Sequence, residues 1–122
     1  MTDKEIAVNF LQAAATGNVA EAFALYTSTA MVHHNPYFAA PKDVIAAAMI
    51  ENQKENPDKQ FEIRHVIEEN GFVAVHSKVR LPAKNMVIAI VHIFKIESNK
   101  ITELWDIGQQ LPADSPNSAG MF

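Results

Sequence analysis

The hydrophobic pattern of this chain changes near Phe61, and this change restricts the fold more than any other feature. Before it, apolar residues recur at helical spacing; after it, β-branched and aromatic residues fill four runs separated by short polar turns. Helices followed by a meander of strands predict an α+β fold, with the helices on one face of a curved antiparallel sheet. A sheet bent around helices is expected to enclose a pocket.

Start and stop signals place the elements. Thr2 and Glu5 have the spacing of a capping box, while Gly17 and Pro57 end helical segments. Short polar turns such as Asn70-Gly71 favour hairpins between antiparallel neighbours. The expected helices span about residues 2–17, 18–26 and 41–55, with a loop over 31–38. The expected strands span residues 61–68, 72–81, 86–96 and 101–111.

Composition excludes several classes of function. Ten basic and fourteen acidic residues give a net charge of -4, and without a run of Lys or Arg we expect no nucleic-acid partner. The N-terminus lacks a secretory signal and no apolar stretch could span a bilayer, so we expect a cytoplasmic protein with no membrane partner. A length of 122 residues predicts one domain over 1–122, with 112–122 as a flexible C-terminal tail.

Side chains alternate across a strand, which assigns them to two faces. In the last strand, Leu104 and Asp106 share one face and Trp105 takes the other. In the third strand, Lys95 marks the partly exposed face. The opposite face, expected to point inward, carries Ile90, His92 and Phe94.

Asp106 is the most unusual residue of the last strand. Both of its neighbours, Trp105 and Ile107, are apolar, and a carboxylate in a buried strand is costly unless it is paired, hydrogen-bonded or protonated. One interpretation is a structural aspartate bonded to a backbone amide or to a histidine. The other is a general base in a pocket, with the inward His92 or the loop residue His34 as its partner.

The other polar candidates also have two interpretations. His76 shares a strand face with Lys78 and Arg80, and such a face is usually wet unless a bulge changes the register. A lone histidine is also more often a satisfied structural residue than a catalyst. The Asn-Pro sequence favours a turn that would hold the side chains of His34 and Asn35 at the end of the helical hairpin. Alternatively, Asn35 only caps a local turn.

Metal and nucleotide sites are not expected. There is no Cys, no His-x-His on a strand and no pair of His at helical spacing, and the adjacent His33 and His34 cannot easily chelate one ion. Glycine-rich phosphate loops and dinucleotide fingerprints are absent as well. We therefore expect neither a metal nor a cofactor.

Several segments resemble the SnoaL-like polyketide cyclases. These enzymes belong to the nuclear-transport-factor-2-like superfamily, together with ketosteroid isomerase and scytalone dehydratase. The most specific segment is Lys100-Ile-Thr-Glu-Leu-Trp-Asp106, followed by Gln109, and the second is His34-Asn-Pro36. The runs 73–77 and 91–95 add weaker support. The resemblance covers nearly the whole chain in order.

The resemblance implies a cone-shaped barrel with a deep pocket, often paired through its sheet into a homodimer. In such cyclases the aspartate that matches Asp106 is a general base: it removes a proton from a carbon next to carbonyl groups, and the enolate then closes a ring. Neither metal nor organic cofactor is needed. His34 and His92 would donate hydrogen bonds to the enolate oxygen. The expected substrate-binding residues are Asn35, Tyr37, His76, Leu104, Trp105, Ile90 and Phe94.

Two positions depart from the family pattern. Many relatives carry His at the position of Leu104 and an acidic residue at the position of His92. We therefore predict that His92 takes over the partner role, within hydrogen-bond range of Asp106. The expected function is that of a cofactor-independent lyase or isomerase acting on a small carbonyl or polyketide-like compound. The alternative is a non-catalytic module that binds a small apolar ligand or dimerises through Trp105 and the outer sheet face.

Overall fold

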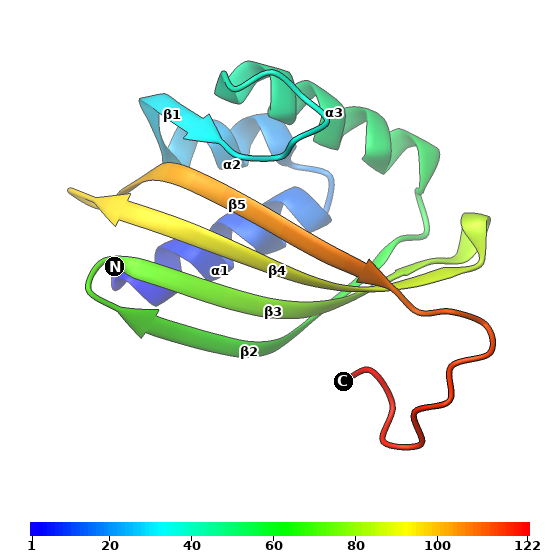
Figure 1. Ribbon diagram of the computed structural model, residues 1–122. Coiled ribbons are helices and arrows are strands. Elements are labelled where there is room, and N and C mark those ends of the chain that lie inside the picture. Colours follow the sequence, from blue (N-terminus) through cyan, green and yellow to red (C-terminus); the bar gives the residue numbers. More distant parts are fainter.

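A computed structural model describes all 122 residues, and it contains three helices and one five-stranded sheet. The helices lie together on one face of the sheet (Figure 1). In chain order the elements are α1 (Asp3–Ala15), α2 (Val19–Tyr26), β1 (Thr27–His33), α3 (Lys42–Glu55), β2 (Gln60–Glu69), β3 (Phe72–Leu81), the 3-10 turn η1 (Pro82–Lys84), β4 (Met86–Glu97) and β5 (Lys100–Gln110). The predicted α+β class is confirmed. None of the helices has the length and apolar character that crossing a membrane requires.

The predicted helix signals act as expected. The backbone N–H of Glu5 donates to the hydroxyl of Thr2, and the N–H of Thr2 donates to the carboxylate of Glu5, both at 3.2 Å. Gly17, at a φ of 91°, lies just beyond the end of α1 in a conformation that favours glycine. Pro41 is the N-cap of α3, and that helix ends two residues before Pro57.

Strands β2 to β5 form the predicted antiparallel meander. The turns between them contain residues with positive φ, namely Asn70 and Gly71 in one and Ser98 and Asn99 in another. Asn and Gly tolerate this left-handed conformation better than other residues. The strand ends agree with the predicted ranges to within one or two residues.

The predicted loop over residues 31–38 is wrong for its first three residues and correct for 34–38. Thr27–His33 forms β1, which pairs with β5 in the parallel direction, with His33 opposite Leu104. Seven residues between a helix and a loop offer little periodicity, so this strand is defined by its partner and not by its own pattern. The sheet is therefore mixed, not purely antiparallel.

The sheet is open, so the cone-shaped barrel that the resemblance implies is not closed. Its order is β1-β5-β4-β3-β2, and the two edge strands β1 and β2 do not pair with each other. One core joins helices and sheet: Phe10 on α1 packs edge-to-face against Phe23 on α2, at 5.1 Å between ring centroids, and against Phe94 on β4, at 5.7 Å. This contact anchors α1 on the inner face of the sheet.

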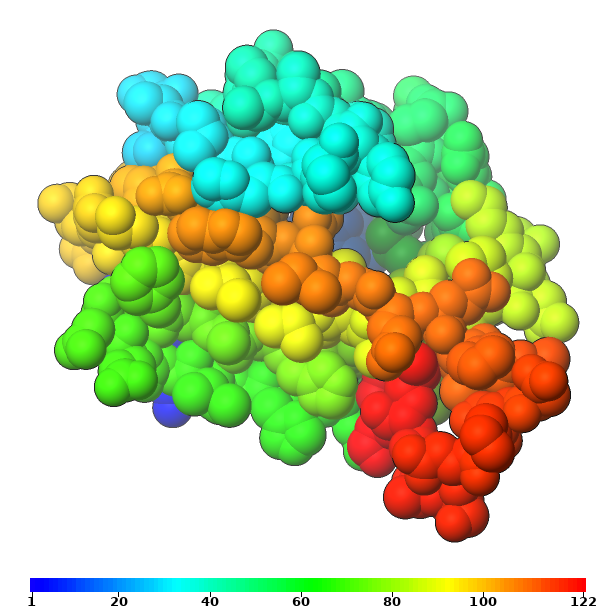
Figure 2. All heavy atoms as spheres, viewed as in Figure 1, coloured from blue at the N-terminus to red at the C-terminus, as the bar shows by residue number.

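The C-terminal tail has no helix or strand after Gln110, but its last residue returns to the sheet. The ring of Phe122 stacks on His76 at 6.0 Å, and Nζ of Lys78 lies 5.3 Å from its centroid. In the space-filling view the end of the chain, in red, lies against the body (Figure 2). The tail therefore covers part of the outer face of β3.

Candidate active site

A pocket of about 500 Å³ is bounded by helices α1 and α3 and by the inner face of the sheet. Pockets of this size suit small organic ligands, for which about 300 to 1,000 Å³ is usual. Of the 22 residues that line it, 15 are hydrophobic. The molecular surface is hollowed between the segment after β1 and strand β5, and atoms of the N-terminal helices show at the bottom (Figure 2). The pocket therefore offers an apolar interior with a few polar groups.

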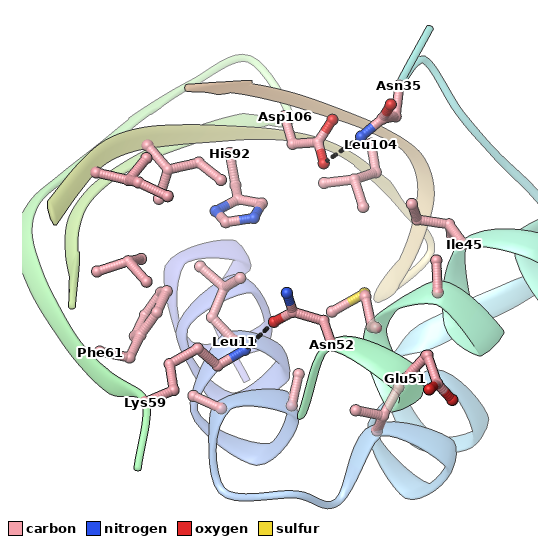
Figure 3. A pocket seen from close by; sticks show the side chains of 18 of the residues that line it. Leu11, Asn35, Ile45, Glu51, Asn52, Lys59, Phe61, His92, Leu104 and Asp106 are labelled. Atoms are coloured by element: carbon pink, nitrogen blue, oxygen red, sulfur yellow. Dashed lines mark hydrogen bonds between the residues drawn. The ribbon is translucent and has the colours of Figure 1, made fainter. Parts of the chain in front are cut away.

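Asp106 lines this pocket from the inner face of β5, as strand alternation predicts. Its Oδ2 accepts a hydrogen bond from Nδ2 of Asn35 at 3.1 Å (Figure 3). Its Oδ1 is buried and has no hydrogen-bond partner, and the carboxylate forms no ion pair. The carboxylate is thus held by a single neutral donor, which is neither the backbone amide nor the histidine considered from sequence.

Asn35 is held in place by its own loop. Its backbone N–H donates to Nδ1 of the buried His33 at 3.1 Å, and its Oδ1 accepts from the backbone N–H of Tyr37 at 3.0 Å. The other ring nitrogen of His33 contacts the carbonyl of Ala39. Asn35 therefore does more than cap the local turn, because its Oδ1 makes that cap while its Nδ2 contacts Asp106.

His92 lies in the pocket lining next to Asp106. The two residues are direct partners in the antiparallel pairing of β4 with β5, and His92 is buried as predicted. Burial lowers the pKa of His92 to about 4; the charge of Asp106 opposes this shift and that of Lys59 adds to it. The imidazole is therefore neutral at physiological pH.

The predicted hydrogen bond between His92 and Asp106 is not formed. Directly opposite side chains in an antiparallel pair leave the sheet side by side, at about 5 Å between Cβ atoms. Asp106 instead bonds to Asn35, and Nδ1 of His92 is buried without a partner. The ring of His92 lies near that of Phe61, at 6.5 Å between centroids.

Lys59 is a polar group of the pocket that the sequence pattern does not reveal. Lys59 lines the pocket from the segment between α3 and β2, and its Nζ donates to Oδ1 of Asn52 at 3.0 Å (Figure 3). Burial lowers the pKa of Lys59. In sequence, Lys59 follows a proline and an aspartate between two elements, where a solvated lysine is the ordinary expectation, so no local signal distinguishes it.

His34 points away from the pocket, onto the outer face of β5. Its Nε2 lies 2.8 Å from Oε2 of Glu103, and its ring stacks on that of Trp105 at 4.7 Å between centroids. His33 faces inward and His34 outward because successive side chains of extended chain point to opposite sides. Neither His34 nor Trp105 lines the pocket.

His76 also projects from the outer face. Its Nδ1 lies 2.9 Å from Nδ1 of His65 on β2, and the rings are stacked. The register shift in this pair falls within β2, between Ile63 and His65, so the alternation of β3 is kept and His76 shares the outer face with Lys78. No three His, Cys, Asp or Glu residues of the chain are grouped so that they could hold a metal ion.

Of the remaining residues predicted to bind substrate, two line the pocket and two do not. Ile90 and Leu104 line the pocket as expected from their strand faces. Phe94 lies deeper, fully buried in the core next to His92, and does not line the pocket. Tyr37 is 87% exposed, because the turn that holds Asn35 directs it outward.

Comparisons with known proteins agree with this architecture. The sequence model of the family described as SnoaL-like domain matches residues 7–104. Similar solved structures include AclR, a proposed hydroxylase from Streptomyces galilaeus, at 17% identity and a TM-score of 0.75, with 88% of each chain covered. IdmH, a proposed polyketide cyclase from Streptomyces antibioticus, is 11% identical with a TM-score of 0.73, over 88% of this chain and 92% of IdmH.

A nuclear-transport-factor-2-like protein from Cytophaga hutchinsonii is 16% identical with a TM-score of 0.68, over 89% of this chain and 91% of that protein. No curated protein matches the sequence. At such identities the structures show a shared fold, while the activities named belong to those proteins.

Proposed function

The chain belongs to the SnoaL-like domain family, and on this premise we propose that its pocket binds a small carbonyl compound and that Asp106 removes a proton from it. The proton comes from a carbon next to a carbonyl group, and the C–H bonding electrons pass into an enolate. The enolate then attacks a second carbonyl of the same molecule in an aldol closure, and the alkoxide formed takes the proton from Asp106. In an isomerisation, the enolate instead regains the proton at another carbon. No other reactant is required.

The state of the Asp106 carboxylate is the observation that carries this proposal. It lies in a mostly apolar pocket, forms no ion pair, and receives one hydrogen bond, from the neutral amide of Asn35. A carboxylate neutralised by Arg or Lys would be a poor base, whereas this one has no cationic partner. The bond from Asn35 orients the carboxylate through Oδ2 and leaves Oδ1 without a hydrogen bond.

His92 supplies the second part of the proposed mechanism. A neutral imidazole carries one N–H, which can donate to the oxygen on which enolate charge develops. Its position directly opposite Asp106 allows one substrate to contact both side chains, the base at its carbon and the donor at its oxygen. His92 thus acts on the substrate, and not as a hydrogen-bond partner of the base.

We also propose that the protein forms a homodimer through the outer face of its sheet. Three large hydrophobic residues on or near this face are well exposed, with 61% of Ile107, 66% of Ile67 and 42% of Phe72 accessible. The ring of Trp105 lies 6.3 Å from that of Phe72. An exposed apolar face of this kind is typical of a surface that pairs with a second copy.

Deuterium exchange tests the general base directly. With benzylacetone in D2O, NMR should show protein-catalysed exchange of the hydrogens next to the carbonyl group, above the buffer rate. Asp106→Asn should lower this rate by about 10²-fold or more while ligand affinity, measured by calorimetry, is kept. Asp114→Asn, which removes the same charge from the exposed tail, is the matched control.

Two results would contradict the proposed chemistry. Exchange that is unchanged in Asp106→Asn would exclude Asp106 as the base. Binding of the ketone by the natural protein without any exchange would favour the alternative, a non-catalytic module that uses the same pocket to hold its ligand.

A further inference from the structure

Lys59 is a positively charged group of the pocket that has no negative partner in the protein. Its Nζ makes one hydrogen bond, to the neutral side chain of Asn52 at 3.0 Å, and it forms no ion pair. A lysine ammonium has three N–H donors, so two remain for a ligand. Glu55 also lines the pocket, but its carboxylate lies 3.5 Å from Nζ of Lys84.

Hydrogen bonds hold the backbone that leads from α3 to Lys59. The N–H of Asn56 donates to the carbonyl of Asn52 at 3.0 Å, and the N–H of Lys59 donates to the carbonyl of Asn56 at 3.1 Å. The side chain of Asn56, only 1% exposed, adds a further bond to the carbonyl of Asn52. These bonds join Lys59 to the last turn of α3, so its position in the pocket is set by the helix.

Lys59 and Asp106 lie on either side of His92. The charges of both residues act on the pKa of His92: that of Asp106 raises it and that of Lys59 lowers it. In the close view of the pocket, Asp106 lies above the ring of His92 and the amine of Lys59 lies below it, beside Asn52 (Figure 3). A ligand with its reacting carbon at Asp106 can therefore extend past His92 toward Lys59.

An anionic ligand group would complete the environment of Lys59. Burial without a counter-charge disfavours the ammonium, and its pKa is accordingly lowered. A carboxylate beside Nζ would reverse this effect, because each ion stabilises the charged form of the other. The apolar lining between the two ends would hold the carbon skeleton.

We propose that Lys59, held by Asn52, binds a carboxylate of the ligand, and that the ligands of this pocket are keto acids whose carboxylate is remote from the reacting carbon. The assignment of the reacting end rests on the proposed function above. The anchoring contact does not, because it concerns affinity and not proton transfer. The two can therefore fail separately.

A pair of matched ligands tests the anchor. Para-carboxybenzylacetone carries the carboxylate, and its methyl ester has the same skeleton without the charge. Calorimetry should show that the natural protein binds the acid about ten- to a hundredfold more tightly than the ester. Lys59→Met should abolish this preference, and Lys59→Arg should retain most of it. Lys54→Met, which removes an exposed charge from the last turn of α3, should keep the full preference.

The outcomes separate the anchor from the base. An acid that binds no better than the ester, or a preference that survives in Lys59→Met, overturns the anchor. Loss of the preference in Lys54→Met as well would show a general effect of charge, and also overturns it. Exchange of the hydrogens next to the ketone of the ester should fall in Asp106→Asn, whereas the preference for the acid should remain in that variant. Deuterium exchange could be absent in all variants while the preference for the acid over the ester still depends on Lys59. In that case the proposed chemistry is wrong, and the proposed contact between Lys59 and the carboxylate is retained.

Discussion

Asn35 donates a hydrogen bond from Nδ2 to Oδ2 of Asp106 at 3.1 Å, although the two residues are 71 positions apart in the chain. The parallel pairing of β1 with β5 makes this contact, since the N–H of His34 donates to the carbonyl of Leu104 at 2.9 Å and brings the loop beside the carboxylate. A strand that local pattern does not reveal thus positions the polar end of the pocket. The orientation of the proposed base depends on it.

Asn35→Ala should lower the rate of ketone deuterium exchange by about tenfold, mostly in kcat, because a carboxylate that loses an oriented donor samples unproductive positions. The measurement is NMR exchange with benzylacetone over a range of concentrations. Asn117→Ala, in the exposed tail, is the control. An unchanged kcat in Asn35→Ala would show that Asp106 needs no orientation by the loop.

The folded protein should lose stability in acid through His92. Burial lowers its pKa from 6.5 to about 4 against opposition from Asp106, with Lys59 adding to the shift. Between these two pH values the unfolded chain binds a proton that the folded protein does not. This contribution is therefore fully present above about pH 6.5 and is lost as pH falls toward about 4, by about 3 kcal/mol in total.

Urea unfolding near pH 7 and near pH 4.5 measures this loss. His92→Gln should show a smaller drop between the two conditions than the natural protein, because its side chain does not titrate. His76→Gln, which removes a histidine from the outer face, should keep the full drop. Equal drops in His92→Gln and the natural protein would contradict a neutral buried His92.

His34→Ala should leave the exchange rate within about twofold of the natural value, because the imidazole lies on the outer face against Glu103 and Trp105. The cost should appear in stability, at about 0.5 to 1 kcal/mol, from the lost stacking on Trp105 and the lost, partly exposed hydrogen bond to Glu103. Urea unfolding and NMR exchange on the same sample separate the two effects. A large loss of deuterium exchange with unchanged stability would show instead that His34 takes part in the reaction.

Ile107→Glu should shift the protein from dimer to monomer in sedimentation at micromolar concentration. A carboxylate on the apolar outer face of β5 would have to lose its hydration in the interface, and this cost disfavours pairing. Gln12→Glu adds the same charge on the exposed side of α1 and should leave the dimer intact. A natural protein that sediments as a monomer would contradict the proposed pairing.

Local sequence was sufficient for most of the elements and for part of the site. The capping box at Thr2, the prolines around α3 and the turn residues of the meander act within a few positions, so their effect can be read from neighbours. Strand alternation placed Asp106 and His92 in the pocket for the same reason, because the side-chain period of a strand is fixed by its geometry.

The partners of those residues were decided by the tertiary structure. Pairing of β1 with β5 brings Asn35 to Asp106 and places His34 against Glu103 and Trp105 on the outer face. Lys59 gains its role only because the end of α3 passes over the pocket. Such contacts depend on how distant segments pack, and no periodicity encodes them. Local geometry therefore determines which face a side chain occupies, whereas long-range packing determines what it meets there.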